Sequence, residues 1–185
     1  MRVDFSPPDI TDAECQEVLD ALQSGWITTG PRTKSLEKRV AERCGTSRAV
    51  CLNSATASLE LTLRVLGIGP GDEVIVPAYT YTASASPVVH VGATPVLVDA
   101  GEADGGYGLD PSVLAGAITP RTKAVIPVDI GGRMCDYAGL REVVDSQRHL
   151  FAASSPVQEA LGRIALVADG AHSFGARRDD TPSGS

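Results

Sequence analysis

The sequence has 185 residues, of which 43% are hydrophobic and 21% charged, a composition that suits a soluble globular protein with one sizeable core. The formal net charge is −7, and no block rich in Lys or Arg stands out, which argues against a nucleic-acid or anionic membrane surface as a partner. An anionic small molecule is still compatible with this charge, because a few backbone amides or arginines suffice to bind a phosphate group.

The cysteines and the N-terminus indicate a cytoplasmic protein. The four cysteines, at positions 15, 44, 51 and 135, form no CxxC pair, so we expect buried free thiols in a reducing compartment. The first ten residues contain no apolar stretch of signal-peptide length, and no later apolar run approaches the roughly 18 residues of a membrane span.

Two helices are predicted at the start of the chain. Thr11 and Glu14 have the spacing of a capping box, in which each side chain satisfies a backbone N–H at the start of a helix. Apolar residues then recur at positions 15, 18, 19 and 22, and Gly25 ends the pattern. A second helix is predicted over residues 33–44. We assign both helices to an N-terminal helical segment, residues 1–46.

Beyond this segment, short apolar runs alternate with helical patterns. Strands are predicted at residues 49–52, 73–76, 95–98, 124–128 and 164–168, and helices at residues 57–66, 82–91, 111–118 and 137–144. Asp110 and Asp136 each precede a helix as N-cap residues. Alternation of strands and helices, with runs apolar on both faces, is typical of a parallel sheet covered by helices. The sequence therefore predicts an α/β fold.

Three segments of this region need a separate interpretation. Residues 147–161, which include a short helix capped by Ser155, form an excursion between a helix and the strand that should follow it. Residues 177–185 are polar and rich in Gly, Ser and Pro, and we expect a tail that closes no domain. The glycines at 67, 69 and 71 follow a helix and open a strand, so they indicate a turn and not a dinucleotide-binding loop.

Ligands of an open parallel sheet bind at the carboxyl ends of its strands, which directs attention to the residues that follow each strand. After the first predicted strand, Ser54, Ala55 and Thr56 open a helix, and this pattern fits either a phosphate site or a plain helix cap. Tyr79 and Tyr81 follow the second strand, where an aromatic ring either stacks on a flat ligand or packs against the protein.

The residues after the last predicted strand give the strongest single candidate. Asp169 ends a hydrophobic strand, and a carboxylate is costly to bury there without a partner. His172 is a weaker candidate, raised by its place three residues beyond Asp169. The three scattered histidines suggest no metal site, and the HExxH, GKS/T and GxSxG motifs are absent.

Taken together, the motifs resemble one known family. The succession TTGP, LNSATASLEL, LGIGPGDEVIVPAYTYTASA, GATPVLVD, ITPRTKAVIPV and ADGAHSFGA is similar to the DegT/DnrJ/StrS-type nucleotide-sugar aminotransferases, and it covers roughly residues 25–176. The resemblance implies a fold-type-I scaffold dependent on pyridoxal 5′-phosphate (PLP), with a three-layer α/β/α large domain and a mostly parallel sheet. Residues 47–176 would form an incomplete large domain, followed by a truncated tail at 177–185.

The resemblance also assigns roles to individual residues. Ala55 and Thr56 would hold the PLP phosphate, and Tyr81 would stack on the pyridine ring. Asp169 would pair with the protonated ring nitrogen, and His172 would lie near the hydroxyl of the ring. The loop with Thr29 and Gly30 would lie close to the active site, beside the substrate.

Three departures from the family pattern bear on the function. Asp129 stands where many relatives have His, which leaves the sugar subgroup open, and the insertion at 147–161 is longer than in many members. The family's Schiff-base lysine, in a segment like SFHxxK, would lie beyond Ser185, and Lys34, Lys38 and Lys123 are not placed to replace it. No catalytic residue is therefore expected in this chain. The predicted strand at 49–52 would also lack its neighbours, so it would stay unpaired or dock elsewhere and leave an exposed sheet edge.

The resemblance implies a parent enzyme of polysaccharide biosynthesis that works as a homodimer. It would transfer an amino group from glutamate or glutamine to a keto sugar linked to a nucleotide, whereas the fragment alone would be inactive. Two alternatives stay open: a PLP-dependent sugar dehydratase of the same superfamily, in which His replaces the lysine, and a non-catalytic truncated or regulatory relative.

Overall fold

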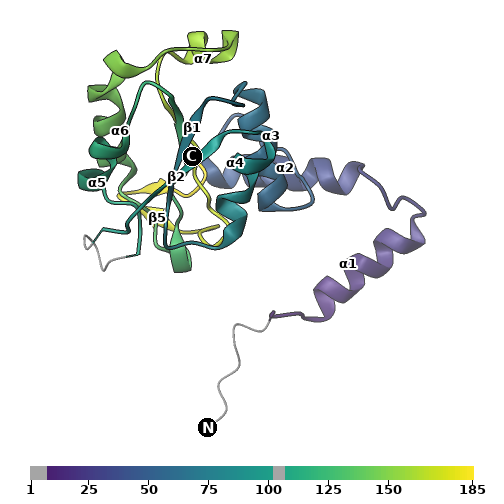
Figure 1. Cartoon of the computed structure of the whole chain (residues 1–185). Coiled ribbons are helices and arrows are strands. Elements are labelled where there is room, and N and C mark those ends of the chain that lie inside the picture. Colours follow the sequence, from purple (N-terminus) through teal and green to yellow (C-terminus); the bar gives the residue numbers. More distant parts are fainter. Residues whose placement is uncertain (1–7, 102–106) are drawn as a thin grey trace.

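The computed structural model describes residues 8–101 and 107–185, so residues 1–7 of the predicted N-terminal segment lie outside the described part. Its elements follow one another along the chain as shown in Figure 1. They are α1 (Asp12–Gln23), α2 (Pro31–Cys44), α3 (Ala55–Val65), β1 (Glu73–Pro77), η1 (Thr82–Ser84), α4 (Ser86–His90), β2 (Thr94–Val98), α5 (Pro111–Ala117), β3 (Thr122–Val125), η3 (Ile130–Gly132), α6 (Tyr137–Ser146), η4 (Arg148–Leu150), α7 (Pro156–Leu161), β4 (Ala165–Leu166), β5 (Arg177–Arg178) and β6 (Thr181–Pro182).

The central sheet has four strands in the order β2-β1-β3-β4, and every pair is parallel. The chain passes from β1 outward to β2, crosses back over β1 to β3, and continues to β4 on the other side. The strand order thus reverses between β1 and β3, which is where open parallel sheets place their ligands. Strands β2 and β4 are the two edges of the sheet.

Helices cover both faces of this sheet, which confirms the predicted α/β/α layering. On one face, Leu59 and Leu63 of α3 and Val88 of α4 pack with the sheet residues Val74 and Val76. A second cluster covers the opposite face, with members on α5, α6, the strands and the segments next to them: Ile75, Leu109, Leu114, Ile118, Val125, Cys135, Leu140, Val144 and Ile164. Burial on both faces explains the continuous apolar runs of the strands.

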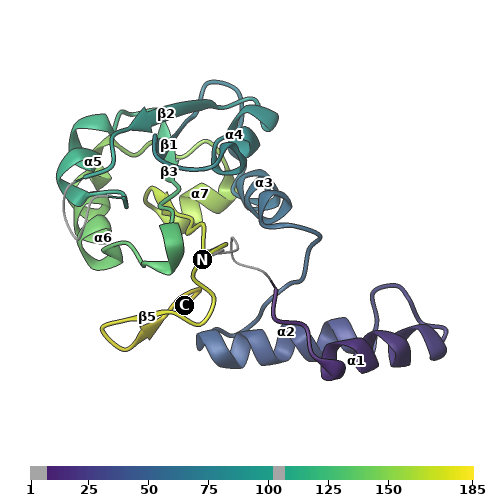
Figure 2. The ribbon, with the colours of Figure 1, turned by 90° about the horizontal axis from the view of Figure 1, so that it is seen from below.

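The N-terminal helices lie beside this layered body and not within it (Figures 1 and 2). The capping box that Thr11 and Glu14 predict is present at the start of α1. None of the residues of α1 is buried, however, so the prediction of a buried thiol is wrong for Cys15, which is exposed. Cys44 and Cys135 are buried, as predicted, and Cys51 is partly buried. Among the residues described, no helix has the length and apolar character needed to cross a membrane.

The predicted strand at residues 49–52 does not form. Val50 and Leu52 are 72% and 43% exposed, and the segment simply joins α2 to α3. A strand needs a neighbour, and the sheet ends at β2 and β4 without including this segment. Its backbone is held instead by the Glu37 carboxylate, which accepts a hydrogen bond from the Cys51 N–H (3.0 Å). The segment thus stays unpaired, the first of the two outcomes that the sequence suggests.

Other elements differ in extent from their predictions. The helix expected over residues 82–91 is split into η1 and α4, because Pro87 in the first turn of α4 has no N–H to continue the earlier turn. The tail at 177–185 forms the β5–β6 hairpin, whose turn places Asp179 and Asp180 at φ 46° and 62°. Two consecutive residues with positive φ suit a two-residue hairpin turn. Asp adopts a positive φ more readily than most residues do.

A buried carboxylate ties the amino ends of β1 and β3 together and gives the first prediction. Burial raises the pKa of Glu73, but hydrogen bonds from Thr119 and Arg121 outweigh that effect and hold its pKa below the ordinary 4.5. Glu73 therefore stabilises the folded state fully above about pH 4.5 and loses this contribution as the pH falls through its lower folded pKa. At pH 7, Glu73→Gln should lower the free energy of unfolding by about 1–2 kcal/mol.

Urea unfolding at several pH values checks this expectation. The difference between Glu73→Gln and the wild type should shrink steadily below pH 4.5, whereas the exposed Glu142→Gln should match the wild type throughout. A difference that is the same at pH 7 and pH 3 would contradict the assignment.

Candidate functional site

One cavity gathers the residues that follow three strands of the sheet. It has a volume of about 100 Å³ and lies at the carboxyl ends of β1, β3 and β4, next to the start of α3. Its lining includes all five residues that the family resemblance assigns to the cofactor: Ala55, Thr56, Tyr81, Asp169 and His172. These residues are separated by up to 117 positions in the chain, so their convergence depends on the fold.

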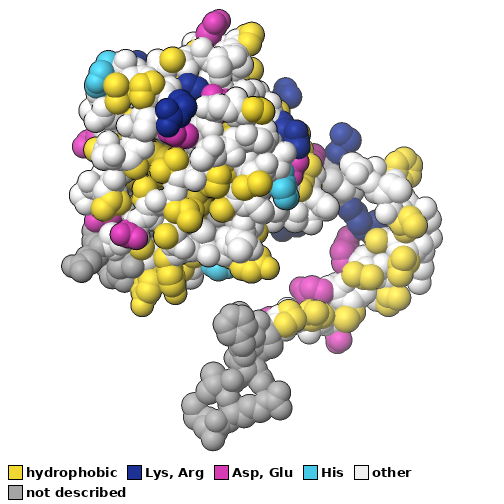
Figure 3. All heavy atoms as spheres, viewed as in Figure 1, with side chains coloured by type: hydrophobic (Ala, Val, Ile, Leu, Met, Phe, Trp, Pro, Cys, Tyr) yellow, Lys and Arg dark blue, Asp and Glu magenta, His cyan; other side chains and the backbone are white. Residues whose placement is uncertain are grey.

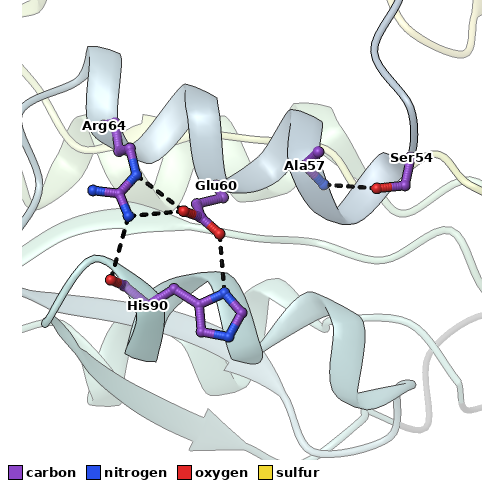
Figure 4. Close-up of polar contacts among 5 residues, drawn as sticks. All are labelled: Ser54, Ala57, Glu60, Arg64 and His90. Atoms are coloured by element: carbon purple, nitrogen blue, oxygen red, sulfur yellow. Dashed lines mark hydrogen bonds and ion pairs between the residues drawn. The ribbon is translucent and has the colours of Figure 1, made fainter.

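The start of α3 forms the positive end of this cavity. Ser54 is the N-cap, and its hydroxyl oxygen accepts a hydrogen bond from the Ala57 N–H at 3.1 Å (Figure 4). This cap leaves the N–H groups of Ala55 and Thr56 available, since the first turn of a helix has no internal acceptors for them. The helix dipole adds to their effect, so an anionic group is favoured at this end.

The outer face of α3 is tied to α4 by one carboxylate. Glu60 accepts hydrogen bonds from Arg64 (2.7 Å) and pairs with His90 Nδ1 (2.9 Å), as Figure 4 shows. Arg64 also donates to the His90 backbone carbonyl at 3.5 Å. The hydrogen bond from Arg64, followed by that from His90, lowers the pKa of Glu60. The carboxylate therefore stays charged at neutral pH and fixes the helix that carries the anion-binding end of the cavity.

Asp169 forms the negative end of the cavity. It is 8% exposed, and its Oδ2 accepts a hydrogen bond from the Ser84 hydroxyl at 2.6 Å. Ser84 in turn lies 2.8 Å from the Thr80 hydroxyl, which donates to it because the Ser84 proton is directed to Asp169. The residue lies where β4 continues beside β3, bridged to Val128. No cation is paired with Asp169 in the part of the chain that the structure describes, so its charge is available to a ligand.

Tyr81 and His172 stand at the open side of the cavity. Tyr81 is 78% exposed, so its ring does not pack against the protein in this structure. Of the two interpretations that its sequence position allows, stacking on a ligand is the one that remains. His172 is exposed as well, and its Nδ1 accepts a hydrogen bond from the Gly131 N–H at 3.2 Å. Both rings are therefore accessible to a molecule that enters the cavity.

The cavity also includes two polar residues that are not among the predicted site residues, although Asp129 is noted above as a departure from the family pattern. Asp129, 1% exposed, and Ser84, 2% exposed, both line it. The rule that singles out Asp169, a carboxylate directly after a buried strand, applies equally to Asp129 after β3 and would have found it. No comparable signal exists for Ser84, whose role depends on the turn that η1 makes after β1.

Thr29 and Gly30 are not among the residues that line the cavity. They lie between α1 and α2, where the Trp26 indole N–H donates to the Thr29 carbonyl at 3.2 Å and the indole ring covers Gly30. A Cβ at Gly30 would lie 2.1 Å from that ring, so a larger residue there would displace the Trp26 side chain. Their place beside the substrate stays a prediction.

The lysines lie away from the cavity. Lys34 and Lys38 are on the exposed side of α2. Lys123, in β3, is buried and its ammonium donates to the carbonyls of Pro120 (2.9 Å) and Ala152 (2.6 Å). None of the three lines the site. That they do not serve as its reactive amine stays a prediction.

The residues of the cavity fit a flat ligand with opposite charges at its two ends. Backbone N–H groups and a helix dipole favour an anion at the start of α3. The uncompensated Asp169 carboxylate favours a cation, and a protonated pyridine nitrogen is one such group. An accessible aromatic ring at Tyr81 offers a stacking surface between them. PLP combines a phosphate, an aromatic ring and a basic ring nitrogen, so the donor set present here suits it.

Comparison with known proteins identifies several relatives. A Streptococcus pneumoniae protein assigned as a sugar aminotransferase, solved in its PLP form, is 56% identical and superposes with a TM-score of 0.95, covering 100% of this chain and 47% of its own. The structure of DesI in the presence of its TDP-sugar product is 36% identical with a TM-score of 0.78, covering 97% of this chain and 41% of that one.

A curated relative gives the same picture. The spore coat polysaccharide biosynthesis protein SpsC of Bacillus subtilis (strain 168) is 44% identical over 142 residues, which are 77% of this chain and 36% of SpsC. The chain thus spans less than half the length of each of these relatives. The family model of the DegT/DnrJ/EryC1/StrS aminotransferases matches residues 8–185. With its parallel sheet and its cavity at the switch in strand order, the chain belongs to the DegT/DnrJ/EryC1/StrS aminotransferase family.

Proposed function

We propose that this chain supplies the cofactor-binding part of a PLP-dependent enzyme that transfers an amino group to a nucleotide-linked keto sugar. The observation that carries this proposal is the opposed polarity of the cavity, with the start of α3 at one end and the buried Asp169 at the other. A phosphate and a protonated ring nitrogen, joined through an aromatic ring, match both ends at once.

Each lining residue has a distinct part in holding the cofactor. The N–H groups of Ala55 and Thr56 bind the phosphate, and Tyr81 stacks on the ring. Asp169 keeps the ring nitrogen protonated, and the Ser84 hydroxyl holds that carboxylate in place (2.6 Å). His172 lies beside the ring hydroxyl. When bound, PLP supplies the electron sink that amino-group transfer requires. The chain's own residues bind and orient it, and keep the proton on its nitrogen.

The proposed sugar substrate rests on the relatives. DesI is described with a TDP-sugar product and SpsC with polysaccharide biosynthesis, which supports a keto sugar on a nucleotide as the acceptor. Glutamate or glutamine is the proposed donor. Because no lysine of this chain lines the cavity, we assign the activity to the complete enzyme and expect the 185-residue chain alone to be inactive.

A homodimer is the proposed assembly. Hydrophobic side chains gather over the β1–β2 region of the layered body and along α1 (Figure 3). Among them, Val18 and Leu22 of α1 are 61% and 60% exposed, and Leu97 of β2 is 60% exposed. Apolar surface of this extent favours association. We also propose a cytoplasmic location, which the four free thiols support.

The proposal is tested by tracing the transferred amino nitrogen with an isotope label. The complete enzyme, supplied with PLP, isotopically labelled glutamate or glutamine and a nucleotide-linked keto sugar, should give an amino sugar that carries the label in mass spectrometry. The same reagents with the 185-residue chain should give none. A complete enzyme that binds PLP but transfers no label to any keto sugar offered would overturn the assignment.

A further inference from the structure

A second buried carboxylate, Asp129, lies beside the candidate cofactor site and is held by neutral groups. Its Oδ1 accepts hydrogen bonds from the Cys135 N–H and the Tyr137 hydroxyl, both at 2.9 Å, and its Oδ2 accepts one from the Ser173 hydroxyl at 2.8 Å. Among the residues described, no Lys, Arg or His forms an ion pair with it. Burying a charge without a cation is costly, so all three donors are needed to keep it.

The donors around Asp129 are fixed in direction. Burial, and then the charge of Asp129, raises the pKa of Tyr137, so its hydroxyl keeps its proton and donates. The Ser173 hydroxyl has one proton, and the Asp129 carboxylate at 2.8 Å is a closer acceptor for it than the Gly170 carbonyl at 3.3 Å. Ser173 therefore accepts in its 2.6 Å contact with the Ser183 hydroxyl, which comes from the end of the β5–β6 hairpin. The result is a chain of hydroxyl groups that ends on the Asp129 carboxylate.

Ser173 lies in the loop that carries the two ligand-facing groups Asp169 and His172. Besides the backbone hydrogen bonds of Asp169, two side-chain contacts tie the loop to the segment after β3: Ser173 donates to Asp129, and the His172 Nδ1 accepts from the Gly131 N–H at 3.2 Å. Gly131 adopts φ 63°, a left-handed conformation that aims its N–H at the ring and that glycine adopts without strain. His172 and Ser173 are neighbours, so a movement of one tie displaces the other.

The second tie determines which nitrogen of His172 carries a proton. Because Nδ1 accepts a hydrogen bond, the neutral ring holds its proton on Nε2. His172 lines the cavity, so it offers an N–H donor there and not a lone pair. We propose that Asp129 is a positioning residue that acts through the Ser173 hydroxyl to hold His172 in this orientation and this tautomer. The positioning of the ring stands on the contacts above, whereas its benefit to the cofactor rests on the proposed function.

A spectroscopic measurement tests the positioning directly. In the 185-residue chain labelled with nitrogen-15, the N–H···N hydrogen bond should give a scalar coupling between the Gly131 amide nitrogen and His172 Nδ1. Ser173→Ala and Asp129→Ala should abolish this coupling. Asp129→Asn should retain it, because its amide group donates to the Ser173 hydroxyl, which then donates onward to Ser183.

A matched control separates positioning from general loss of stability. Asp136→Ala removes a nearby carboxylate that caps α6 through the Gly139 N–H (3.1 Å) and is not among the hydrogen-bond partners of the Ser173 hydroxyl, so it should keep the coupling. The proposal is wrong if the wild type lacks the coupling, if it survives in both Ser173→Ala and Asp129→Ala, or if Asp136→Ala loses it equally.

A separate binding measurement tests whether this positioning benefits the cofactor. Pyridoxamine 5′-phosphate (PMP) should bind Ser173→Ala about 3- to 10-fold more weakly than the wild type in isothermal titration calorimetry. The reason is that a displaced His172 ring would lose its contact with the ligand. Equal affinity, with the coupling lost, would overturn the link between Asp129 and the cofactor site. If the wild type does not bind PMP, the proposed function fails, and the coupling still decides whether Asp129 positions His172.

Discussion

Replacing Asp169 with Asn is expected to weaken binding of PMP to this chain by at least about 30-fold, equivalent to about 2 kcal/mol. The carboxylate is 8% exposed, and the Ser84 hydroxyl is the side chain that donates to it (2.6 Å). Asn keeps the shape and an oxygen that accepts from Ser84, but it removes the charge that would pair with a ring N–H⁺. The loss therefore falls on the ligand more than on the fold.

PMP is the suitable probe because it has no aldehyde and cannot react with Lys34, Lys38 or Lys123. Isothermal titration calorimetry gives the affinities, and circular dichroism should show unchanged secondary structure. Asp99→Asn is the matched control, since Asp99 follows β2 as Asp169 follows β4 but is exposed and outside the cavity lining. Equal PMP affinities of Asp169→Asn and the wild type would refute the pairing.

The second large effect concerns the helix that presents the anion-binding end. Leu63 of α3 is fully buried in the cluster that covers one face of the sheet. Truncation to Ala removes buried methyl groups and leaves a cavity, so Leu63→Ala should lower the free energy of unfolding by about 3 kcal/mol. For a chain of this size that corresponds to a fall in Tm of about 6–12 °C. Urea and thermal unfolding measure both quantities.

The same helix provides the control. Leu61 is two residues away on α3 and 45% exposed, so Leu61→Ala should change the free energy of unfolding by no more than about 0.5 kcal/mol. A similar loss in both variants would mean that α3 is not docked on the sheet through Leu63. Comparing the two variants thus tests, without any ligand, whether α3 and the anion-binding end of the cavity are placed as the structure shows.

Much of the layered body follows from the sequence. Runs such as those around Val74 and Val125 are apolar on both faces because helices cover both sides of the sheet, and this pattern predicts parallel strands directly. The segment at 49–52 has the same apolar character yet forms no strand. Hydrophobicity selects a buried environment, but a strand also needs a partner, and local sequence does not reveal whether one is present.

Some residues of the candidate site can likewise be found from the sequence and others cannot. Asp169 can be found from sequence because a carboxylate after a buried strand is costly and therefore noticeable. Ser84 cannot, since its contact with Asp169 joins residues 85 positions apart. The ordered β5–β6 hairpin is missed for a related reason: its polar residues give no periodic signal, and its place is set by the contact of Ser183 with Ser173.

The two edges of the sheet differ in their capacity to accept another strand. Along β2, the Thr94 N–H bonds inward to Asp72, so Pro95 faces outward and presents no N–H to a newcomer. Along β4 and the residues that continue it, the N–H groups of Val167 and Asp169 bond inward to the carbonyls of Val125 and Pro127, so the outward N–H groups are those of Leu166 and Ala168. By the same alternation, Leu97 is the outward N–H donor that remains on β2, so the β4 edge offers the more complete set of donors to an added strand.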